Sequence, residues 1–251
     1  SHCHLDDDKF GDLDEIVARA LANGVGGILS VGASVNEWDK VLEIAGAYQN
    51  VWASLGVHPY FPEEVKNIKK SAFESKKVIA IGECGLDYNG DNRDDKKGQK
   101  VAFVEQLNIA REFDLPVVIH SREADDDMKD ILISEFKNKE FKAVLHSYTS
   151  GWDLLKAGLD LGFYVSASGI VTFKNAQLVR ENFIKAPLTS MLVETDGPWL
   201  APDPYRGKIC EPFMVAFTAQ KLAQMKGVSF EEVEEVTAKN FFSLFQKAVL
   251  N

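Results

Sequence analysis

The sequence predicts an α/β fold, a TIM-type (β/α)8 barrel that forms a single domain over residues 1–251. A chain of 251 residues that is 45% hydrophobic is large enough for one compact core of barrel size. Short apolar runs alternate with stretches of helical periodicity, which is typical of βα units. An open Rossmann-like sheet is the alternative, and the absence of a GxGxxG fingerprint from the sequence disfavours it.

Seven apolar runs have the length and composition of buried parallel strands. They cover residues 26–32, 51–57, 78–83, 116–120, 143–146, 163–168 and 191–195. A closed barrel needs an eighth strand, and the natural place for it is immediately before and through the opening tetrapeptide SHCH. Only Ser1 precedes His2, so we expect that a few native N-terminal residues of this strand are missing from the sequence.

Stretches of helical spacing separate the expected strands. Four of them cover residues 12–24, 36–48, 98–113 and 152–162, and Gly24 is the stop signal of the first. A proline-rich loop follows residue 195 and leads into two further helical segments. The second of these opens with a capping box that runs from Ser229 to Glu232.

Composition limits where the protein works and what it binds. Cys3, Cys84 and Cys210 are an odd number of cysteines without a CxxC pair, so neither a disulfide framework nor a zinc ribbon is indicated, and a reducing cytoplasm fits best. No window approaches the roughly 20 apolar residues of a membrane span, so we expect no membrane partner. The net charge of −10 argues against broad adhesion to nucleic acid, but acids around a cation site would still allow a polyanionic substrate locally.

All five histidines lie at the C-terminal ends of the expected strands. They are His2 and His4 on the first strand, then His58, His120 and His146. These strand ends open on one face of a barrel, so the side chains should converge there. Because alternate strand residues share a face, His2 and His4 should point into the barrel while Cys3 points outward. A single histidine after a strand is more often a hydrogen-bonded loop residue, but five of five favour a common site.

Two acids occupy equivalent strand ends, Glu83 and Asp196. With four imidazoles they could hold two divalent ions, and Glu83 could bridge the two. Taken alone, each acid could instead be a helix N-cap or a salt-bridge partner. Cys3 and Cys84 adjoin these candidate ligands, and we interpret both as small buried apolar residues that face away from the site.

The same histidines and acids belong to motifs that extend over nearly the whole chain. In sequence order the motifs are SHCHLD, GVHP, GECGLDY, IHSRE, LHSYTS, ETDGPWL, the EP of KICEP, and NFFSLF. In this order and spacing the chain resembles the TatD-type metal-dependent deoxyribonucleases, which are amidohydrolase-like barrel hydrolases. It departs from their usual pattern at residues 147–150, where members often have Cys-Phe-Thr-Gly, and at residues 208–210, where members often carry an Arg and an Asn. These departures spare the candidate ligands and concern substrate contacts.

The resemblance implies a ligand set and a reaction. His2, His4, Glu83 and Asp196 would bind one metal ion, Glu83, His120 and His146 would bind the second, and His58 would lie near the scissile phosphate. The reaction would be hydrolysis of DNA from 3′ ends by a water activated by two metal ions. Imidazole-rich sites suit Zn²⁺ or Mn²⁺, whereas the family is usually described as magnesium-dependent, so the choice among Mg²⁺, Mn²⁺ and Zn²⁺ stays open.

We expect Asp196 and Glu83 to be the catalytic residues, with Asp196 both a metal ligand and the acceptor of the attacking water's proton. Glu194 is either a support for a ligand or a buried structural acid. We expect Arg122 and His58 to bind substrate, and a recessed barrel mouth favours single-stranded ends over duplexes. Further loop residues could contact phosphates or unpaired bases, or could merely pack: Lys174, Arg206, Lys208, Tyr60, Tyr88, Tyr148, Trp199 and Tyr205.

Two other functions are compatible with such a barrel. The first is hydrolysis of a small-molecule amide, lactone or phosphoester, because fold and metal site do not determine the leaving group. Relatives of that kind commonly bridge their metals with a carbamylated lysine, and Glu83 at the corresponding strand end favours the nuclease. The second is an inactive interaction protein, which the intact set of ligand positions disfavours. The oligomeric state stays open, and a monomer is compatible with the sequence.

Overall fold

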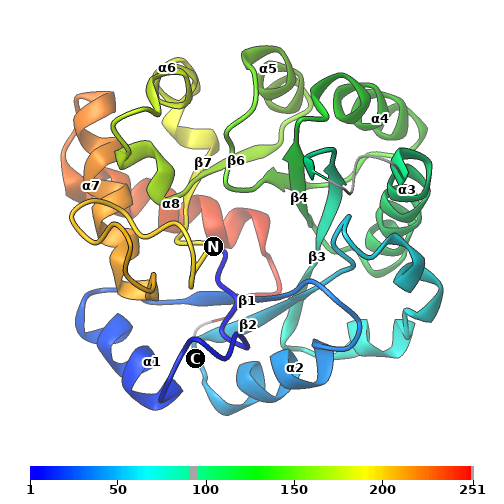
Figure 1. Cartoon of the computed structure of the whole chain (residues 1–251), viewed down its shortest axis with the longest axis horizontal. Helices are drawn as coiled ribbons and strands as arrows, with labels where there is room; N and C mark the ends of the chain where they lie inside the picture. Colours follow the sequence, from blue (N-terminus) through cyan, green and yellow to red (C-terminus); the bar gives the residue numbers. More distant parts are fainter. Residues whose placement is uncertain (91–94, 250–251) are drawn as a thin grey trace.

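Seven parallel strands form the centre of the protein, and each pairs with the next in sequence order from β1 to β7. The computed structural model describes residues 1–90 and 95–249, and Figure 1 shows the strands curling inside a layer of helices. This arrangement confirms the predicted TIM-type α/β fold. The strands are β1 (Ile28–Gly32), β2 (Val51–Leu55), β3 (Val78–Asp87), β4 (Val117–Arg122), β5 (Ala143–Leu145), β6 (Tyr164–Ala167) and β7 (Met191–Val193).

Helices follow the strands along the chain and cover their outer side (Figure 1). They are α1 (Leu13–Ala22), α2 (Trp38–Ala47), α3 (Lys96–Phe113), α4 (Asp125–Asn138), α5 (Trp152–Asp160), α6 (Gln177–Lys185), α7 (Val215–Lys226) and α8 (Phe230–Leu244). The predicted cap of α8 is present, since the Ser229 hydroxyl accepts a hydrogen bond from the Glu232 amide at 3.1 Å. None of the helices in the described ranges is both long and apolar enough to cross a bilayer.

The core around the strands has two parts because alternate strand residues point to opposite sides. Ile28 packs in the large cluster between the strands and the outer helices, whereas its neighbour Leu29 packs in a second cluster inside the barrel. Phe241 and Phe245 of α8 belong to the inner cluster. Figure 1 shows α8 behind the strands, so this helix closes the end of the barrel opposite the candidate site.

The opening tetrapeptide fills the space between β1 and the chain that follows β7. Cys3 forms isolated parallel bridges with Ser30 on one side and Gly197 on the other. The His4 amide donates to the Gly197 carbonyl at 2.8 Å. An eighth strand was predicted here, and the structure has a single bridging residue instead because the chain turns directly afterwards, where the Asp7 amide bonds to the His4 carbonyl. This bridge completes the ring of strands.

A close approach of β3 and β4 places Glu83 and His120 next to each other. Gly85 has a φ of 148° and lies opposite His120 in the strand register. A Cβ at Gly85 would lie 2.0 Å from the His120 carbonyl oxygen, so no other residue fits without moving the backbone. Glycine is therefore required at the step between the two strands that carry these site residues.

Candidate metal centre

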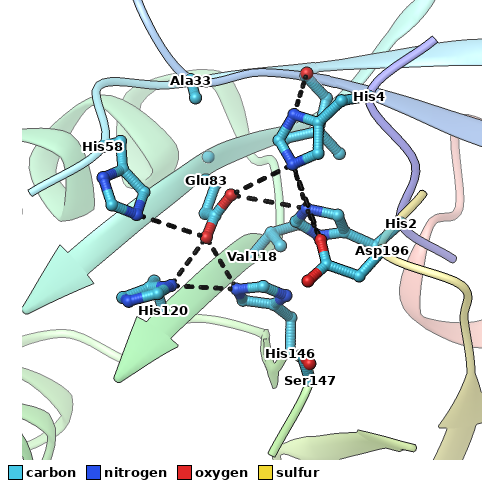
Figure 2. A network of polar contacts seen from close by, with 12 residues as sticks. His2, His4, Ala33, His58, Glu83, Val118, His120, His146, Ser147 and Asp196 are labelled. Atoms are coloured by element: carbon cyan, nitrogen blue, oxygen red, sulfur yellow. Dashed lines mark hydrogen bonds and ion pairs between the residues drawn. The ribbon is translucent and has the colours of Figure 1, made fainter. Parts of the chain in front are cut away.

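Glu83 lies at the middle of the converging strand ends and faces five imidazoles (Figure 2). Its Oε2 atom is 3.4 Å from His2 Nε2 and 3.6 Å from His4 Nε2. Its Oε1 atom is 2.7 Å from His120 Nδ1 and 2.8 Å from His146 Nε2. One carboxylate thus presents one oxygen to each of two histidine pairs, which is the arrangement that a carboxylate bridging two ions requires.

The first group comprises His2, His4, Glu83 and Asp196. The two Nε2 atoms are 3.1 Å apart, and Asp196 Oδ1 lies 3.5 Å from His2 Nε2 and 3.7 Å from His4 Nε2. Ligand atoms at 2.0–2.2 Å around a tetrahedral ion are about 3.3–3.6 Å from one another. The spacing of this group therefore fits a cation in its middle, and it is too long for strong direct hydrogen bonds to the carboxylates.

The second group comprises Glu83, His120 and His146. His120 Nδ1 and His146 Nε2 are 3.3 Å apart and both face Glu83 Oε1. His58 Nε2 also faces this oxygen, at 3.6 Å. His58, Glu83 and His120 bring their ligand-type atoms within 4.8 Å of one another, as do His2, His4 and Glu83. The predicted site residues on six separate segments are thus brought together.

Hydrogen bonds on the outer side of three imidazoles determine which nitrogen carries a proton. The contacts are His4 Nδ1 to the Val31 carbonyl at 3.1 Å, His120 Nε2 to Asp87 Oδ2 at 2.9 Å, and His146 Nδ1 to Glu194 Oε1 at 3.3 Å. A carbonyl or carboxylate oxygen only accepts here, so each outer nitrogen donates. The inner nitrogens are then left with lone pairs directed at the centre, as in metal-ligating histidines.

The inner nitrogens of His120 and His146 lie 2.7–2.8 Å from Glu83 Oε1. At this distance a nitrogen lone pair and a carboxylate oxygen repel each other unless a proton or a cation lies between them. Without a metal ion, protons take that place. Burial alone would lower the pKa of His4, but Asp196 and Glu83 raise it to about 9. Burial likewise opposes protonation of His146 and His120, yet Glu83 with Glu194 raises the pKa of the first, and Asp87 with Glu83 raises that of the second. The donor set therefore fits divalent cations, which would replace these protons.

The central acids are ionised. Burial would raise the pKa of Glu83, but His146, His120 and His2 hold it well below its ordinary value. Asp196 is half-buried, and the nearby His4 and His2 lower its pKa to about 2. Both side chains are thus carboxylates at neutral pH, as ligands to a divalent ion must be.

The sequence matches the family described as TatD related DNase over residues 1–246. The chain belongs to this family. The metal-dependent hydrolase YcfH of Escherichia coli K12 is 40% identical over 98% of this chain and 94% of its own length. YabD of Bacillus subtilis, also described as a metal-dependent hydrolase, is 35% identical over 98% of each chain. The protein is accordingly a metal-dependent hydrolase of the TatD DNase family.

Solved structures agree with this membership. YjjV, a TatD homologue of E. coli K12, superposes with a TM-score of 0.90 at 30% identity, covering 98% of this chain and 96% of its own. An organophosphorus hydrolase of Deinococcus radiodurans superposes with a TM-score of 0.63 at 12% identity, over 92% of this chain and 82% of its own. The second likeness concerns the fold alone, so the TatD-type barrel scaffold by itself does not determine the substrate.

His58 differs from the other histidines of this TatD-family site. Its Nδ1 accepts a hydrogen bond from the Tyr60 amide at 3.1 Å, which leaves the ring proton on Nε2. Burial lowers its pKa to about 3, so the ring is neutral. His58 therefore directs an N–H donor toward the second group. Its role as a residue that contacts substrate, and not as a ligand, stays a prediction.

A cleft of about 1070 Å³ opens over the centre. Arg122, at the end of β4, is exposed and lines the cleft, and its binding of phosphate stays a prediction. Of the other predicted substrate contacts, Tyr60 and Trp199 line this cleft. The remaining aromatic ones are engaged elsewhere: Tyr88 bonds to Asp127, Tyr148 bonds to the Gly151 carbonyl, and Tyr205 packs on Phe213 and Phe217. The described lining of the cleft does not include Lys174, Arg206 or Lys208.

Asp87 is a site residue that the sequence analysis did not single out. It is fully buried, and its Oδ2 atom accepts the outer proton of His120 at 2.9 Å. Asp87 lies four residues after Glu83 on the same strand and therefore on the same face, but the predicted strand ended at residue 83. The sequence analysis gave Glu194 two interpretations, a support for a ligand or a buried structural acid. In the structure it contacts both the His146 ring and the Ser147 amide, the latter at 2.7 Å. It is a positioning acid for His146.

Backbone strain accompanies two of the strand ends. Asp196 has a φ of 57°, and Ser147, directly after His146, has a φ of 40°. Such left-handed conformations cost a non-glycine residue of order 1–3 kcal/mol and persist where the surroundings enforce them. At these two positions the left-handed conformation turns the chain so that the candidate ligands His146 and Asp196 face inward.

Proposed function

We propose that the protein hydrolyses phosphodiester bonds of DNA, working as a 3′–5′ exonuclease on single-stranded ends with two divalent cations, Mg²⁺, Mn²⁺ or Zn²⁺. The observation that carries the proposal is the orientation of Glu83, with one oxygen toward each histidine pair. His2, His4, Glu83 and Asp196 would hold one cation. Glu83, His120 and His146 would hold the other.

The bound cations supply two things, a lowered pKa of the attacking water and neutralisation of charge on the phosphoryl oxygens. Asp196 accepts the proton of that water. Its Oδ1 atom faces the imidazoles of His2 and His4, and Oδ2 remains for proton transfer. As the water oxygen bonds to phosphorus, one phosphorus–oxygen ester bond breaks, and the leaving oxygen takes a proton from solvent.

Two further residues position the phosphate. The Arg122 guanidinium on the cleft wall binds a non-bridging oxygen through charge-assisted hydrogen bonds. The neutral His58 donates a hydrogen bond from its Nε2–H group to a phosphate oxygen from the side of the second group. Both groups act without changing their protonation state, so their task is orientation and charge stabilisation.

The substrate is tested by incubating purified protein and Mg²⁺, Mn²⁺ or Zn²⁺ with end-labelled single-stranded DNA, duplex DNA, RNA, and a panel of esters and lactones. A ladder of products shortened from the 3′ end of single-stranded DNA is expected. Preferential turnover of an ester or lactone would instead support the small-molecule hydrolase.

The mechanism is tested with Glu83→Gln and Asp196→Asn, both of which should lose the activity, against Glu235→Gln, an exposed acid on α8, as the matched control. If Glu83→Gln and Asp196→Asn cleave as fast as the parent chain, the two-cation mechanism is wrong.

A further inference from the structure

Exposed aromatic side chains gather at the cleft. In the described part of the chain four aromatic side chains are exposed, namely Tyr60 at 41%, Phe61 at 39%, Trp199 at 45% and Phe242 at 36%. The first three line the cleft over the metal centre. Large apolar surface is normally buried, and where it concentrates on one exposed patch it indicates a binding surface.

These side chains lie on two sides of the centre. The Tyr60 ring stands edge-on to His58, with 4.4 Å between ring centroids, and His58 faces the second group. Trp199 follows Asp196 by three residues, and its ring centroid is 5.2 Å from that of His4 in the first group. A phosphate bound over the metal centre would therefore have aromatic surface on either side.

We infer that Trp199 forms one stacking wall and the Tyr60–Phe61 pair the other, and that each wall holds the nucleobase on one side of the scissile phosphate. The inference rests on the proposed function and names its specificity-determining residues. Aromatic stacking accepts every base because each has a π-face, but it requires that the base be unpaired. The two walls thus select single strands without reading their sequence.

Charge around Trp199 supports a base as the occupant of that wall. Lys9 lies with its Nζ 4.9 Å from the Trp199 ring centroid, and this half-exposed side chain also reaches Asp7 at 3.7 Å. Lys9 therefore lies over the ring, and Trp199 is still 45% exposed. Asp6, Asp7 and Asp8 line the cleft together with Glu37. These acids repel a second phosphate and tolerate a neutral base.

The test combines enzyme variants with substrates that lack one base. The substrates are a labelled single-stranded oligonucleotide and two copies in which the terminal or the penultimate 3′ nucleotide is an abasic tetrahydrofuran residue. Trp199→Leu should lower kcat/KM for the intact strand by about 5- to 100-fold. It should leave kcat/KM unchanged for one of the two abasic strands. Phe61→Leu should show the same pattern with the other abasic strand.

Two variants serve as controls. Phe242→Leu changes the exposed aromatic residue on α8, outside the cleft, and should behave as the parent chain. Trp199→Phe keeps a stacking ring and should recover most of the activity that Trp199→Leu loses. This recovery distinguishes loss of stacking from failure to fold.

The outcomes distinguish a failure of the stacking walls from a failure of the proposed nuclease function. Equal cleavage of intact and abasic strands by the parent chain would overturn the stacking walls and leave the nuclease function standing. A Trp199→Leu effect of the same size on all three strands would also overturn them, because it would indicate a structural role. If the parent chain cleaves none of the strands with any of the three cations, both proposals are overturned.

Discussion

The two halves of the metal centre support their imidazoles differently. In the second group, His120 and His146 each bond through the outer nitrogen to a buried carboxylate, Asp87 or Glu194. In the first group, His4 bonds to a backbone carbonyl, and the Nδ1 atom of His2 has no hydrogen-bond partner among the described residues. A carboxylate partner fixes the ring and makes the ligating nitrogen more basic.

This difference indicates a division of labour. The imidazoles of the second half are fixed in place, and their ligating nitrogens are more basic. This half also lies beside Arg122 and His58, so it is suited to holding the phosphate. The first half has Asp196 as its acid on the inner side, directed at the ligands themselves. It is therefore suited to proton transfer. Four predictions test whether this division holds.

The largest effect is expected in the first half. Asp196→Asn keeps an oxygen that can face His2 and His4 but removes the proton acceptor. We expect kcat on single-stranded DNA to fall about 10²- to 10⁴-fold, the usual contribution of a general base. Steady-state kinetics with Mn²⁺ measure this. A fall in kcat below threefold would show that the proton leaves by another route.

An intermediate effect is expected from the outer acids of the second half. Asp87→Asn and Glu194→Gln remove the carboxylates behind His120 and His146, and each should weaken cation affinity or activity about 10- to 100-fold. Calorimetric titration of metal-free protein with Mn²⁺ measures the affinity. Asp127→Asn, which changes an acid of α4 outside the cleft, is the control. If Asp87→Asn and Glu194→Gln match this control, the outer carboxylates do not tune the ligands.

A third prediction concerns pH. In the metal-free protein the pKa of His4 is about 9, raised from an ordinary 6.5, so a cation must displace its proton at neutral pH. Cation affinity should rise from pH 6.5 to pH 9 by about 10-fold per pH unit for each proton displaced. The stability of the metal-free protein should instead fall as pH rises. The stabilisation from His4 is fully present below pH 6.5 and is lost as pH rises through 9.

Both slopes can be measured on one sample, with calorimetry for the affinity and thermal unfolding in the presence of a chelator for the stability. The Tm of the metal-free protein should decline between pH 6.5 and pH 9.5. A cation affinity that does not change with pH would mean that the imidazoles are already neutral without metal.

The smallest effect is expected next to Glu83 on the other face of β3. Cys84 is fully buried, and burial first and Glu83 second raise the pKa of its thiol. Cys84→Ala should cost roughly 1 kcal/mol of stability and leave kcat/KM within twofold. Denaturant unfolding and the DNA assay measure the two. A large loss of activity would indicate that the thiol contributes to the site.

The sequence was sufficient to predict the barrel and the convergence of the histidines, because each histidine follows an apolar run and parallel strands end on one face. It was not sufficient for Asp87. Strand β3 extends through residue 87, whereas the predicted run ended at 83, since the glycines and acids of GECGLD read as a loop. The close contact of Gly85 with the His120 backbone explains why a strand tolerates that composition.

The choice among the aromatic residues could not be made from sequence either. Tyr60, Tyr148 and Trp199 all follow strand ends, and whether such a ring is buried depends on how neighbouring loops pack. In the structure Tyr148 is 3% exposed and bonds to the Gly151 carbonyl, whereas Trp199 is open to solvent. Long-range packing of this kind leaves no local pattern in the chain.

The narrow bridge at Cys3 has a consequence for unfolding. One residue, Cys3, joins the ring of strands there, and it lies between His2 and His4. Its bridge partner on the side of β7 directly follows Asp196. A cation bound by His2, His4, Asp196 and Glu83 would act as a cross-link between the first residues of the chain and a segment near residue 196. At a free cation concentration 100 times Kd, this cross-link would add about 2.7 kcal/mol to the free energy of unfolding. Chelation should therefore loosen the barrel along this seam, and amide hydrogens of β1 and β7 should exchange faster than those of β3 and β4.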